Sequence, residues 1–116
     1  MALKKIINGL VFQEDGSFVT KTVYICDEKI VSEEDYRNAS GEETVIDAAG
    51  HYVIPGLTDI HFHGCMGSDC CDGTVEALRT IAHYELSQGI TSITPATMTM
   101  PEEVLTQICC AAKDFS

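Results

Sequence analysis

The first half of the chain consists of short apolar runs that alternate with polar positions, a pattern typical of β-strands with one buried face. Turn-forming residues separate the runs, first at Asn8 and Gly9 and again at 14–17. The polar, acidic segment 32–43 is predicted to be an exposed loop. The predicted strands cover residues 3–7, 10–12, 18–26, 30–31, 44–47 and 52–54. Together they predict a meander over residues 1–55 that forms part of a small β-sandwich.

The second half has a different pattern, with strand, helix, strand and helix in turn. The runs 57–63 and 90–94 are short and apolar, and the second is β-branched, as buried parallel strands tend to be. Thr74 is a good N-cap for the first helix and Gly89 is the expected stop after it, while the segment from Thr99 resembles a capping box that opens the second helix. The apolar helical stripes comprise Val75, Leu78, Ile81, Ala82 and Leu86, then Val104, Leu105, Ile108, Ala111, Ala112 and Phe115. Two successive βα units predict the start of a parallel α/β structure.

The strand predicted at 57–63 carries two histidines separated by one apolar residue. Alternate side chains of a strand share a face, so Asp59, His61 and His63 are predicted to point the same way. Two imidazoles on one face, with Gly64 ending the run, can supply two ligands to one transition metal ion at the end of a strand. We therefore predict a metal site at His61 and His63. Asp59 is expected either to hydrogen-bond an imidazole N–H and fix its orientation, or to be a buried acid that only organises its surroundings.

Three cysteines, Cys65, Cys70 and Cys71, follow closely after the histidines, so a mixed Cys and His zinc site is an alternative. Their spacing lacks the two-residue separation of structural zinc knuckles, and it favours small buried or loop thiols instead. The other two histidines, His51 and His83, are isolated in the sequence and are predicted to be structural or exposed.

Charge and cysteine content narrow the class of protein. Seven Lys and Arg against 18 Asp and Glu give a formal net charge of −11, which argues against nucleic acid, heparin or an anionic membrane as partner. No apolar run approaches the ~20 residues that a membrane span needs. The six cysteines include two adjacent pairs, which are poor partners for orderly disulfides, and the first residues do not resemble a signal peptide. We therefore predict a reduced, cytoplasmic protein.

Residues 45–64 resemble the opening signature of the amidohydrolase superfamily, with the sequence VIDAAGHYVIPGLTDIHFHG. Further positions are similar to the N-acetylglucosamine-6-phosphate deacetylases: Gly64 to Gly67, Asp69, Asp72 to Thr74, and 89–97. The resemblance implies a (β/α)8 barrel of the TIM type, accompanied by a small β-sandwich built from segments on both sides of the barrel. On this resemblance the chain is an incomplete, N-terminal portion of an α/β plus β enzyme. Residues 1–55 would form a β-sandwich segment, and residues 56–116 the first two βα units of the barrel.

The resemblance also implies a chemistry, in which metal-activated water attacks the acetamide of N-acetylglucosamine 6-phosphate and gives glucosamine 6-phosphate and acetate. The expected cofactor is a divalent metal, zinc first, with iron, manganese, cobalt or nickel as alternatives. The remaining ligands and the aspartate that acts as general base are implied to lie beyond Ser116, so no catalytic residue is expected here and the 116-residue chain alone is expected to be inactive. The histidine pair varies among these deacetylases, so His61 and His63 either bind a second ion or help to position one. The sequence assigns no substrate-binding residue.

Two alternatives remain open. The same superfamily includes cyclic-amide hydrolases and deaminases; a metal-bridging lysine on the fourth barrel strand favours the cyclic-amide branch, and a glutamate ligand on the third favours the deacetylases. From a different class, a non-catalytic metal-binding or assembly module, complete at 116 residues, accounts for the same motif. The resemblance implies a homodimer. The open edges of strands 57–63 and 90–94 also predict that the chain self-associates.

Overall fold

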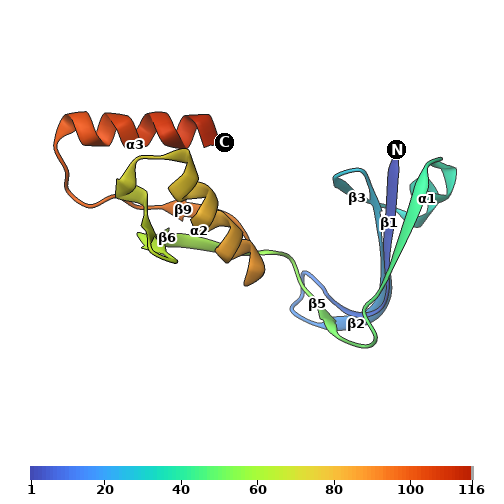
Figure 1. Ribbon diagram of the computed structural model, residues 1–116. Helices are drawn as coiled ribbons and strands as arrows, with labels where there is room; N and C mark the ends of the chain where they lie inside the picture. The colour runs from blue at the N-terminus through green and yellow to red at the C-terminus, as the bar shows by residue number, and fades with distance from the viewer. Residues whose placement is uncertain (116) are drawn as a thin grey trace. The chain divides into compact units, whose positions relative to one another are not determined.

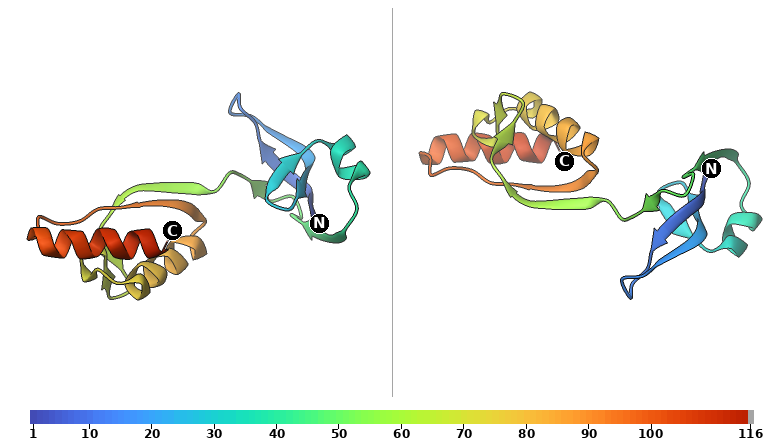
Figure 2. Two further views of the ribbon diagram at one scale, coloured as in Figure 1. Left: turned by 90° about the horizontal axis from the view of Figure 1, so that it is seen from above. Right: turned by 90° about the horizontal axis from the view of Figure 1, so that it is seen from below.

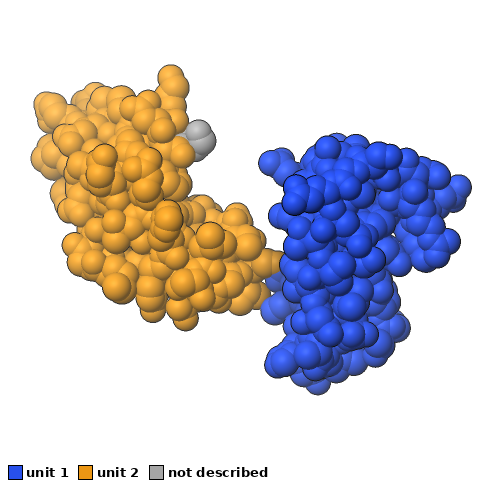
Figure 3. Space-filling view, turned by 45° about the vertical axis from the view of Figure 1, so that its right-hand side comes forward, with its two compact units in different colours: residues 1–55 blue, residues 56–116 orange. Residues whose placement is uncertain are grey.

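The computed structural model describes residues 1–115, and the chain divides into two compact units, Met1–Pro55 and Gly56–Ser116 (Figure 1, Figure 3). Each unit has its own sheet and its own buried side chains. The chain is of mixed α/β class, in agreement with the combination of strands and helices expected from its sequence. No helix within residues 1–115 combines the length and apolar character that crossing a membrane requires.

The first unit is a five-stranded sheet with one short helix (Figure 1). Its elements are β1 (Ala2–Phe12), β2 (Phe18–Cys26), β3 (Lys29–Val31), α1 (Glu33–Asn38), β4 (Glu42–Asp47) and β5 (Tyr52–Val53). The strand order is β3-β2-β1-β4, and β5 also pairs with β1. Strand β1 is antiparallel to β2 but parallel to β4 and β5, so the predicted meander is wrong in this respect. The reason is the connection between β3 and β4. It crosses β2 and β1 to reach the other side of β1, and it contains α1.

Strand β1 is continuous where the pattern predicts two strands with a stop between them. Asn8 adopts the left-handed conformation, with φ of 57°, and the register against β2 shifts between Ile6 and Gly9. Asn and Gly tolerate such conformations, so they form a bulge inside the strand instead of ending it. The Asn8 side chain also donates a 3.0 Å hydrogen bond to Asp47, through which β4 holds the bulge in place.

Helix α1 occupies part of the segment whose polarity predicts an exposed loop. Ser32 is its N-cap and accepts a 3.1 Å hydrogen bond from the Asp35 N–H. Three acidic residues in the first turn suit the positive end of the helix dipole. Only Tyr36 of this helix is buried, so the segment lacks the apolar periodicity by which a helix is predicted.

The second unit contains two parallel strands, two helices and a short hairpin. Its elements are β6 (Leu57–Phe62), β7 (Gly64–Cys65), β8 (Ser68–Asp69), a 3-10 helix (Cys70–Asp72), α2 (Val75–Ser87), β9 (Ile90–Pro95) and α3 (Glu102–Phe115). Strands β6 and β9 are parallel, with Leu57 opposite Ile90 and Asp59 opposite Ile93. Helix α2 connects them and packs against β9, and α3 packs against α2 (Figure 2). This order of elements agrees with the two βα units that the pattern predicts.

Helix α2 begins and ends where its local sequence predicts. Thr74 accepts a 3.2 Å hydrogen bond from the Ala77 N–H at the start, and Gly89, with φ of 85°, follows the end. The core of the unit is made mainly by α2 and α3, and Ile81 is fully buried in it. The other buried apolar side chains of this unit are Cys70, Ala77, Leu78, Ile108 and Ala111. This packing stabilises the connection that brings β9 beside β6.

Helix α3 begins later than predicted. The pattern predicts a capping box at Thr99, but the helix starts at Glu102, and the Leu105 N–H donates to the carbonyl of Pro101 at 3.0 Å. Proline suits the start of a helix because it has no N–H to satisfy and its φ is already helical. Pro101 therefore sets the start of α3, and residues 96–100 form the loop that follows β9.

Candidate functional site

The two histidines of the sequence motif lie together at the C-terminal end of β6. His61 is exposed within the strand, and His63, which follows Phe62 directly, is half-buried. The centroids of their imidazole rings are 5.1 Å apart, and the ring planes are perpendicular. The alternate spacing along the strand thus brings both rings to one side of the chain.

This separation fits two imidazoles that share one ion. A zinc–nitrogen bond is ~2.0 Å long, which puts each ring centroid roughly 3 Å from the ion. Two such rings at a tetrahedral angle have centroids roughly 5 Å apart. The 5.1 Å between the rings of His61 and His63 is close to this distance. The distance between the two rings is therefore the one that a shared ion would require.

The remaining half of such a site is not formed by the described residues. Within residues 1–115 no group of three or more His, Cys, Asp or Glu side chains is placed to hold a metal ion. Structural zinc sites have four protein ligands, and catalytic zinc sites usually have three. The histidine pair therefore needs further ligands, and its role in metal binding stays a prediction.

The ring of His63 contacts the backbone at the end of the neighbouring strand, β9. Its Nδ1 atom lies 3.0 Å from the carbonyl oxygen of Ala96, the residue that follows β9. The Ala96 N–H donates to the carbonyl oxygen of Phe62 at 2.8 Å, so the ends of the two parallel strands are joined at two consecutive residues. Sequence reasoning misses this contact, because Ala96 carries no functional side chain and lies 33 positions away.

Asp59 contacts the backbone of the first histidine. Its Oδ1 atom accepts a 3.0 Å hydrogen bond from the backbone N–H of His61. The register of β6 against β9 shifts at this point, between Asp59 and Phe62. Asp59 thus satisfies a backbone donor at an irregularity of the strand, and this bond goes to the peptide group of His61 and not to an imidazole N–H.

A tight loop connects His63 to α2. The hairpin of β7 and β8 pairs Gly64 with Asp69, and a Cβ atom on Gly64 would lie 2.2 Å from the Ser68 carbonyl oxygen. Only glycine therefore fits at the position directly after the histidine. Asp69 then caps the 3-10 helix by accepting a 2.7 Å hydrogen bond from the Cys71 N–H.

The cysteines of this loop lie in surroundings that disfavour zinc binding. Burial raises the pKa of Cys70, which is 3% exposed, and the charge of Asp69 raises it further. Burial, together with the charge of Glu85, raises the pKa of Cys65. A raised pKa disfavours the thiolate form that binds metal. Within residues 1–115 these cysteines and the two histidines also form no group of three or more potential metal ligands, so the mixed Cys and His zinc site is not formed.

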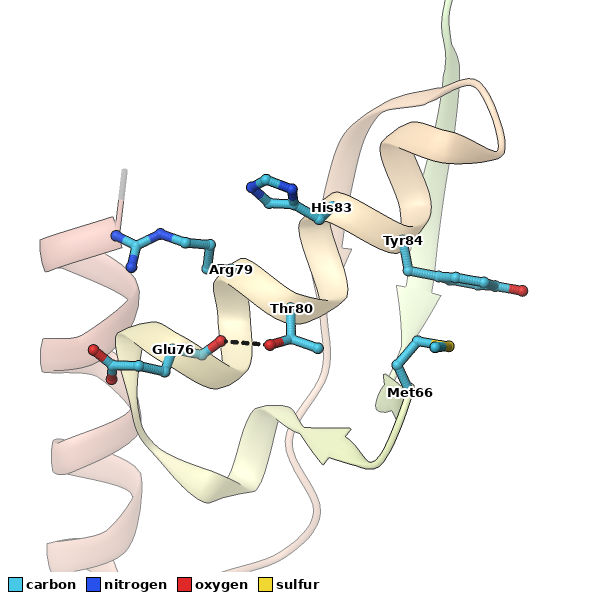
Figure 4. Close-up of a pocket in the computed structure, with 6 residues that line it drawn as sticks. All are labelled: Met66, Glu76, Arg79, Thr80, His83 and Tyr84. Atoms are coloured by element: carbon cyan, nitrogen blue, oxygen red, sulfur yellow. Dashed lines mark hydrogen bonds between the residues drawn. The ribbon is translucent and has the colours of Figure 1, made fainter.

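The other two histidines are exposed, as predicted for isolated positions. The Nδ1 atom of His51 lies 2.7 Å from a backbone carbonyl oxygen of its own turn. His83 lines a hollow of about 570 Å³ beside α2 (Figure 4). The lining residues are Met66, Glu76, Arg79, Thr80, His83 and Tyr84. In Figure 4, His83 and Arg79 project to one side while Met66 and Tyr84 lie on the other, so their side chains do not converge as ligands.

Comparison with known proteins finds similarity to hydrolases over parts of the chain. No protein-family model matches it. An N-acetylglucosamine-6-phosphate deacetylase from Vibrio furnissii is 39% identical over 49 residues, which cover 42% of this chain and 12% of that protein. Another from Lysinibacillus sphaericus is 29% identical over 94 residues, 81% of this chain and 24% of that protein. A dihydroorotase from Bacillus licheniformis is 40% identical over 58 residues, 50% of this chain and 13% of that protein.

The fold has a counterpart among solved structures. The crystal structure of N-acetylglucosamine-6-phosphate deacetylase from Pasteurella multocida matches 97% of this chain, with a TM-score of 0.83 and 21% sequence identity. At this identity the likeness shows the fold alone. The chain spans 12% and 24% of the length of the two deacetylase relatives and 30% of the solved chain.

These relatives define one class, the hydrolases of the amidohydrolase superfamily. The resemblance predicted from residues 45–64 is thereby confirmed. Within that class, both the sequence and the structural comparisons include N-acetylglucosamine-6-phosphate deacetylases, to which this chain is similar.

Proposed function

We propose that the chain forms part of a metal-dependent amidohydrolase whose metal is held in part by His61 and His63. The observation that carries this proposal is the pair of imidazoles on one side of the end of a parallel strand, with ring centroids 5.1 Å apart. In α/β barrel enzymes the active site lies at the C-terminal ends of the strands. A parallel strand that ends in two metal-binding side chains is therefore where such a site is expected.

The proposed fold of the whole enzyme is a (β/α)8 barrel with an accompanying β-sandwich. Residues 1–55 would supply a segment of the sandwich, and residues 56–116 the first two βα units of the barrel. The parallel pairing of β6 with β9 through α2 supports this assignment, as does the similarity to the deacetylase fold.

The residues of this chain would hold and orient the metal. When bound, a divalent metal lowers the pKa of its water to ~7 and polarises a carbonyl, which suits hydrolysis of an amide near neutral pH. His61 and His63 would bind it through neutral imidazole nitrogens. Asp59 holds the backbone of His61, and Ala96 holds the ring of His63, each at 3.0 Å. The general base and the remaining ligands are assigned to residues outside these 116.

The proposed substrate is N-acetylglucosamine 6-phosphate, hydrolysed to glucosamine 6-phosphate and acetate, on the basis of the similarity to the deacetylases. Residues 56–116 contain only two Lys or Arg, Arg79 and Lys113, so most cations that bind the phosphate must come from elsewhere in the enzyme. Zinc is the metal proposed first, with iron, manganese, cobalt or nickel as alternatives. We also propose that the enzyme is a cytoplasmic homodimer.

A cyclic-amide hydrolase is the second candidate, because a dihydroorotase is 40% identical over half of the chain. Both reactions would hydrolyse an amide at a metal site, so the histidine pair does not separate them. The substrate and the missing metal ligands are the features that differ.

The test is to sequence the coding region that follows Ser116 and to assay the full-length product on N-acetylglucosamine 6-phosphate and on dihydroorotate, with and without a chelator. Chelator-sensitive release of acetate, with a glutamate ligand on a third strand, supports the deacetylase. Opening of dihydroorotate, with a metal-bridging lysine on a fourth strand, supports the second candidate. A metal-loaded product that hydrolyses neither substrate, or a reading frame that stops at Ser116, contradicts both. The 116-residue chain alone is expected to hydrolyse neither.

A further inference from the structure

We propose that Cys71 is a positioning residue for His63 and acts through the loop that follows β9. Contacts between this loop and the one that follows β6 link the Cys71 thiol to the His63 imidazole. Through them the thiol helps to set which ring nitrogen of His63 carries the proton. The proposal rests on the proposed function only in its last step, where the other nitrogen meets a metal.

The first contact defines the tautomer of His63. A carbonyl oxygen can only accept, so the Nδ1 atom that lies 3.0 Å from the Ala96 carbonyl must carry the proton. A neutral imidazole has a single N–H, and the hydrogen bond at one nitrogen determines the state of the other. Nε2 of His63 is therefore left with a free lone pair, which is the state required of a metal ligand.

The position of the Ala96 carbonyl depends on the backbone on both sides of it. On one side, the Ala96 N–H is bonded to Phe62 at 2.8 Å, at the end of β6. On the other side, the chain leaves β9 and runs through the irregular segment 96–100 before α3 begins. A contact that holds this segment beyond Ala96 therefore also restricts the direction of the carbonyl.

Cys71 supplies that second attachment. Its Sγ atom accepts a hydrogen bond from the backbone N–H of Met98 at 3.3 Å, two residues after Ala96. Cys71 is itself oriented, because its own N–H donates to Asp69 at 2.7 Å. The preceding residue, Cys70, donates its N–H to the carbonyl of His63 at 2.8 Å. The thiol and the histidine are thereby linked through both loops.

A side chain without an acceptor at position 71 leaves the Met98 N–H without this partner, and segment 96–98 is then freer to turn. The hydrogen bond from His63 Nδ1 to Ala96 weakens, and the tautomer with the proton on Nε2 becomes more populated. That tautomer cannot bind a metal through Nε2. Loss of a contact that orients a metal ligand typically costs about 10–100-fold in metal affinity. Cys71 does not contact His63 itself, so we expect its replacement to lower the metal affinity by about tenfold or less.

The experiment measures the tautomer of His63 directly in the 116-residue chain. Nitrogen-15 NMR of the histidine rings is recorded without metal, about two pH units above the ordinary histidine pKa of ~6.5, with His63→Gln as the assignment control. The variants are Cys71→Ala, which removes the acceptor, and Cys71→Ser, which retains one. Cys109→Ala is the matched control, because Cys109 is an exposed cysteine of α3. The dissociation constant for Co²⁺ is then measured for each variant.

In the wild-type chain His63 is expected to carry its proton on Nδ1. Cys71→Ala should increase the population of His63 with the proton on Nε2 and weaken Co²⁺ binding by up to about tenfold. Cys71→Ser should keep most of the wild-type tautomer population and most of the wild-type Co²⁺ affinity. Cys109→Ala should change neither quantity. A wild-type His63 protonated on Nε2 overturns the proposal, as does a folded Cys71→Ala variant with an unchanged tautomer. Where Cys71→Ala does not fold, Cys71→Val, which fills the space without an acceptor, replaces it. If the tautomer shifts as expected but even the wild-type chain does not bind Co²⁺, the positioning role stands, and the predicted weak metal binding by the histidine pair of this chain fails.

Discussion

The hydroxyl group of Tyr36 donates a 2.9 Å hydrogen bond to Oε1 of Glu43, which ties helix α1 to strand β4 within the first unit. The Tyr36 ring is buried and packs on Tyr24 with centroids 5.0 Å apart. The same carboxylate pairs with Lys5 at 3.1 Å. Burial, followed by the bond to Glu43, raises the pKa of Tyr36 to about 12. The bond from Tyr36, followed by that from Lys5, lowers the pKa of Glu43.

The raised pKa of Tyr36 predicts a loss of stability at high pH. A raised pKa contributes stability that is complete below the unfolded value of 10.0 and is lost as the pH rises through about 12. The urea midpoint of the wild-type chain should therefore fall between pH 10 and pH 12 by more than that of Tyr36→Phe. Tyr52→Phe, which removes an exposed hydroxyl, is the control and should behave as wild type. Parallel pH profiles for wild type and Tyr36→Phe would contradict the role of this bond.

Ile81 is predicted to be a principal stabilising residue of the second unit, because its side chain is fully buried. Ile81→Ala should lower the free energy of unfolding by about 2–5 kcal/mol through lost burial and the cavity left behind. The matched control is Ile60→Ala, whose side chain is 77% exposed, and it should change stability by about 0.5 kcal/mol or less. Urea unfolding followed by helical circular dichroism, which comes mainly from α2 and α3, measures both. Equal losses in the two variants would show that the core lies elsewhere.

The histidine pair is predicted to bind a divalent metal weakly in the 116-residue chain, since two imidazoles supply only part of a coordination shell. Calorimetric titration with Zn²⁺ or Ni²⁺ should show binding that falls by about tenfold or more in the double variant His61→Ala, His63→Ala. The double variant His51→Ala, His83→Ala removes the same number of imidazoles and should retain wild-type affinity. The ligand assignment fails if both double variants bind equally well.

The open sheet of the second unit is predicted to promote self-association. Within residues 1–115, β6 pairs only with β9, and the Ile60 side chain of β6 is 77% exposed. An unpaired strand edge beside apolar side chains is a template for pairing with another chain, and a charge placed there opposes it. Sedimentation over a wide concentration range should show concentration-dependent association that Ile60→Lys reduces. Leu86→Lys, at an exposed leucine of helix α2 and away from any strand edge, is the control and should leave it unchanged. A wild-type chain that stays monomeric throughout would argue against the open-sheet interpretation.

Much of the second unit was predictable from short stretches of sequence. Thr74 and Gly89 mark the ends of α2 because a helix cap depends on hydrogen bonds within a few residues. The alternation of a strand likewise places His61 and His63 on one side without any information about the rest of the fold. Pro101 marks the start of α3 for a local reason too, although the capping pattern pointed to Thr99.

The sequence by itself therefore determined the helices and strands whose ends and faces depend on near neighbours, together with the resemblance carried by residues 45–64. Tertiary structure alone decided the parallel pairing of β1 with β4, the bulge at Asn8 that Asp47 holds, and the bond between His63 and Ala96. Each of these depends on backbone groups or small polar side chains brought together from distant positions, and neither apolar periodicity nor turn chemistry encodes such contacts. Only the folded chain determines which nitrogen of His63 is free.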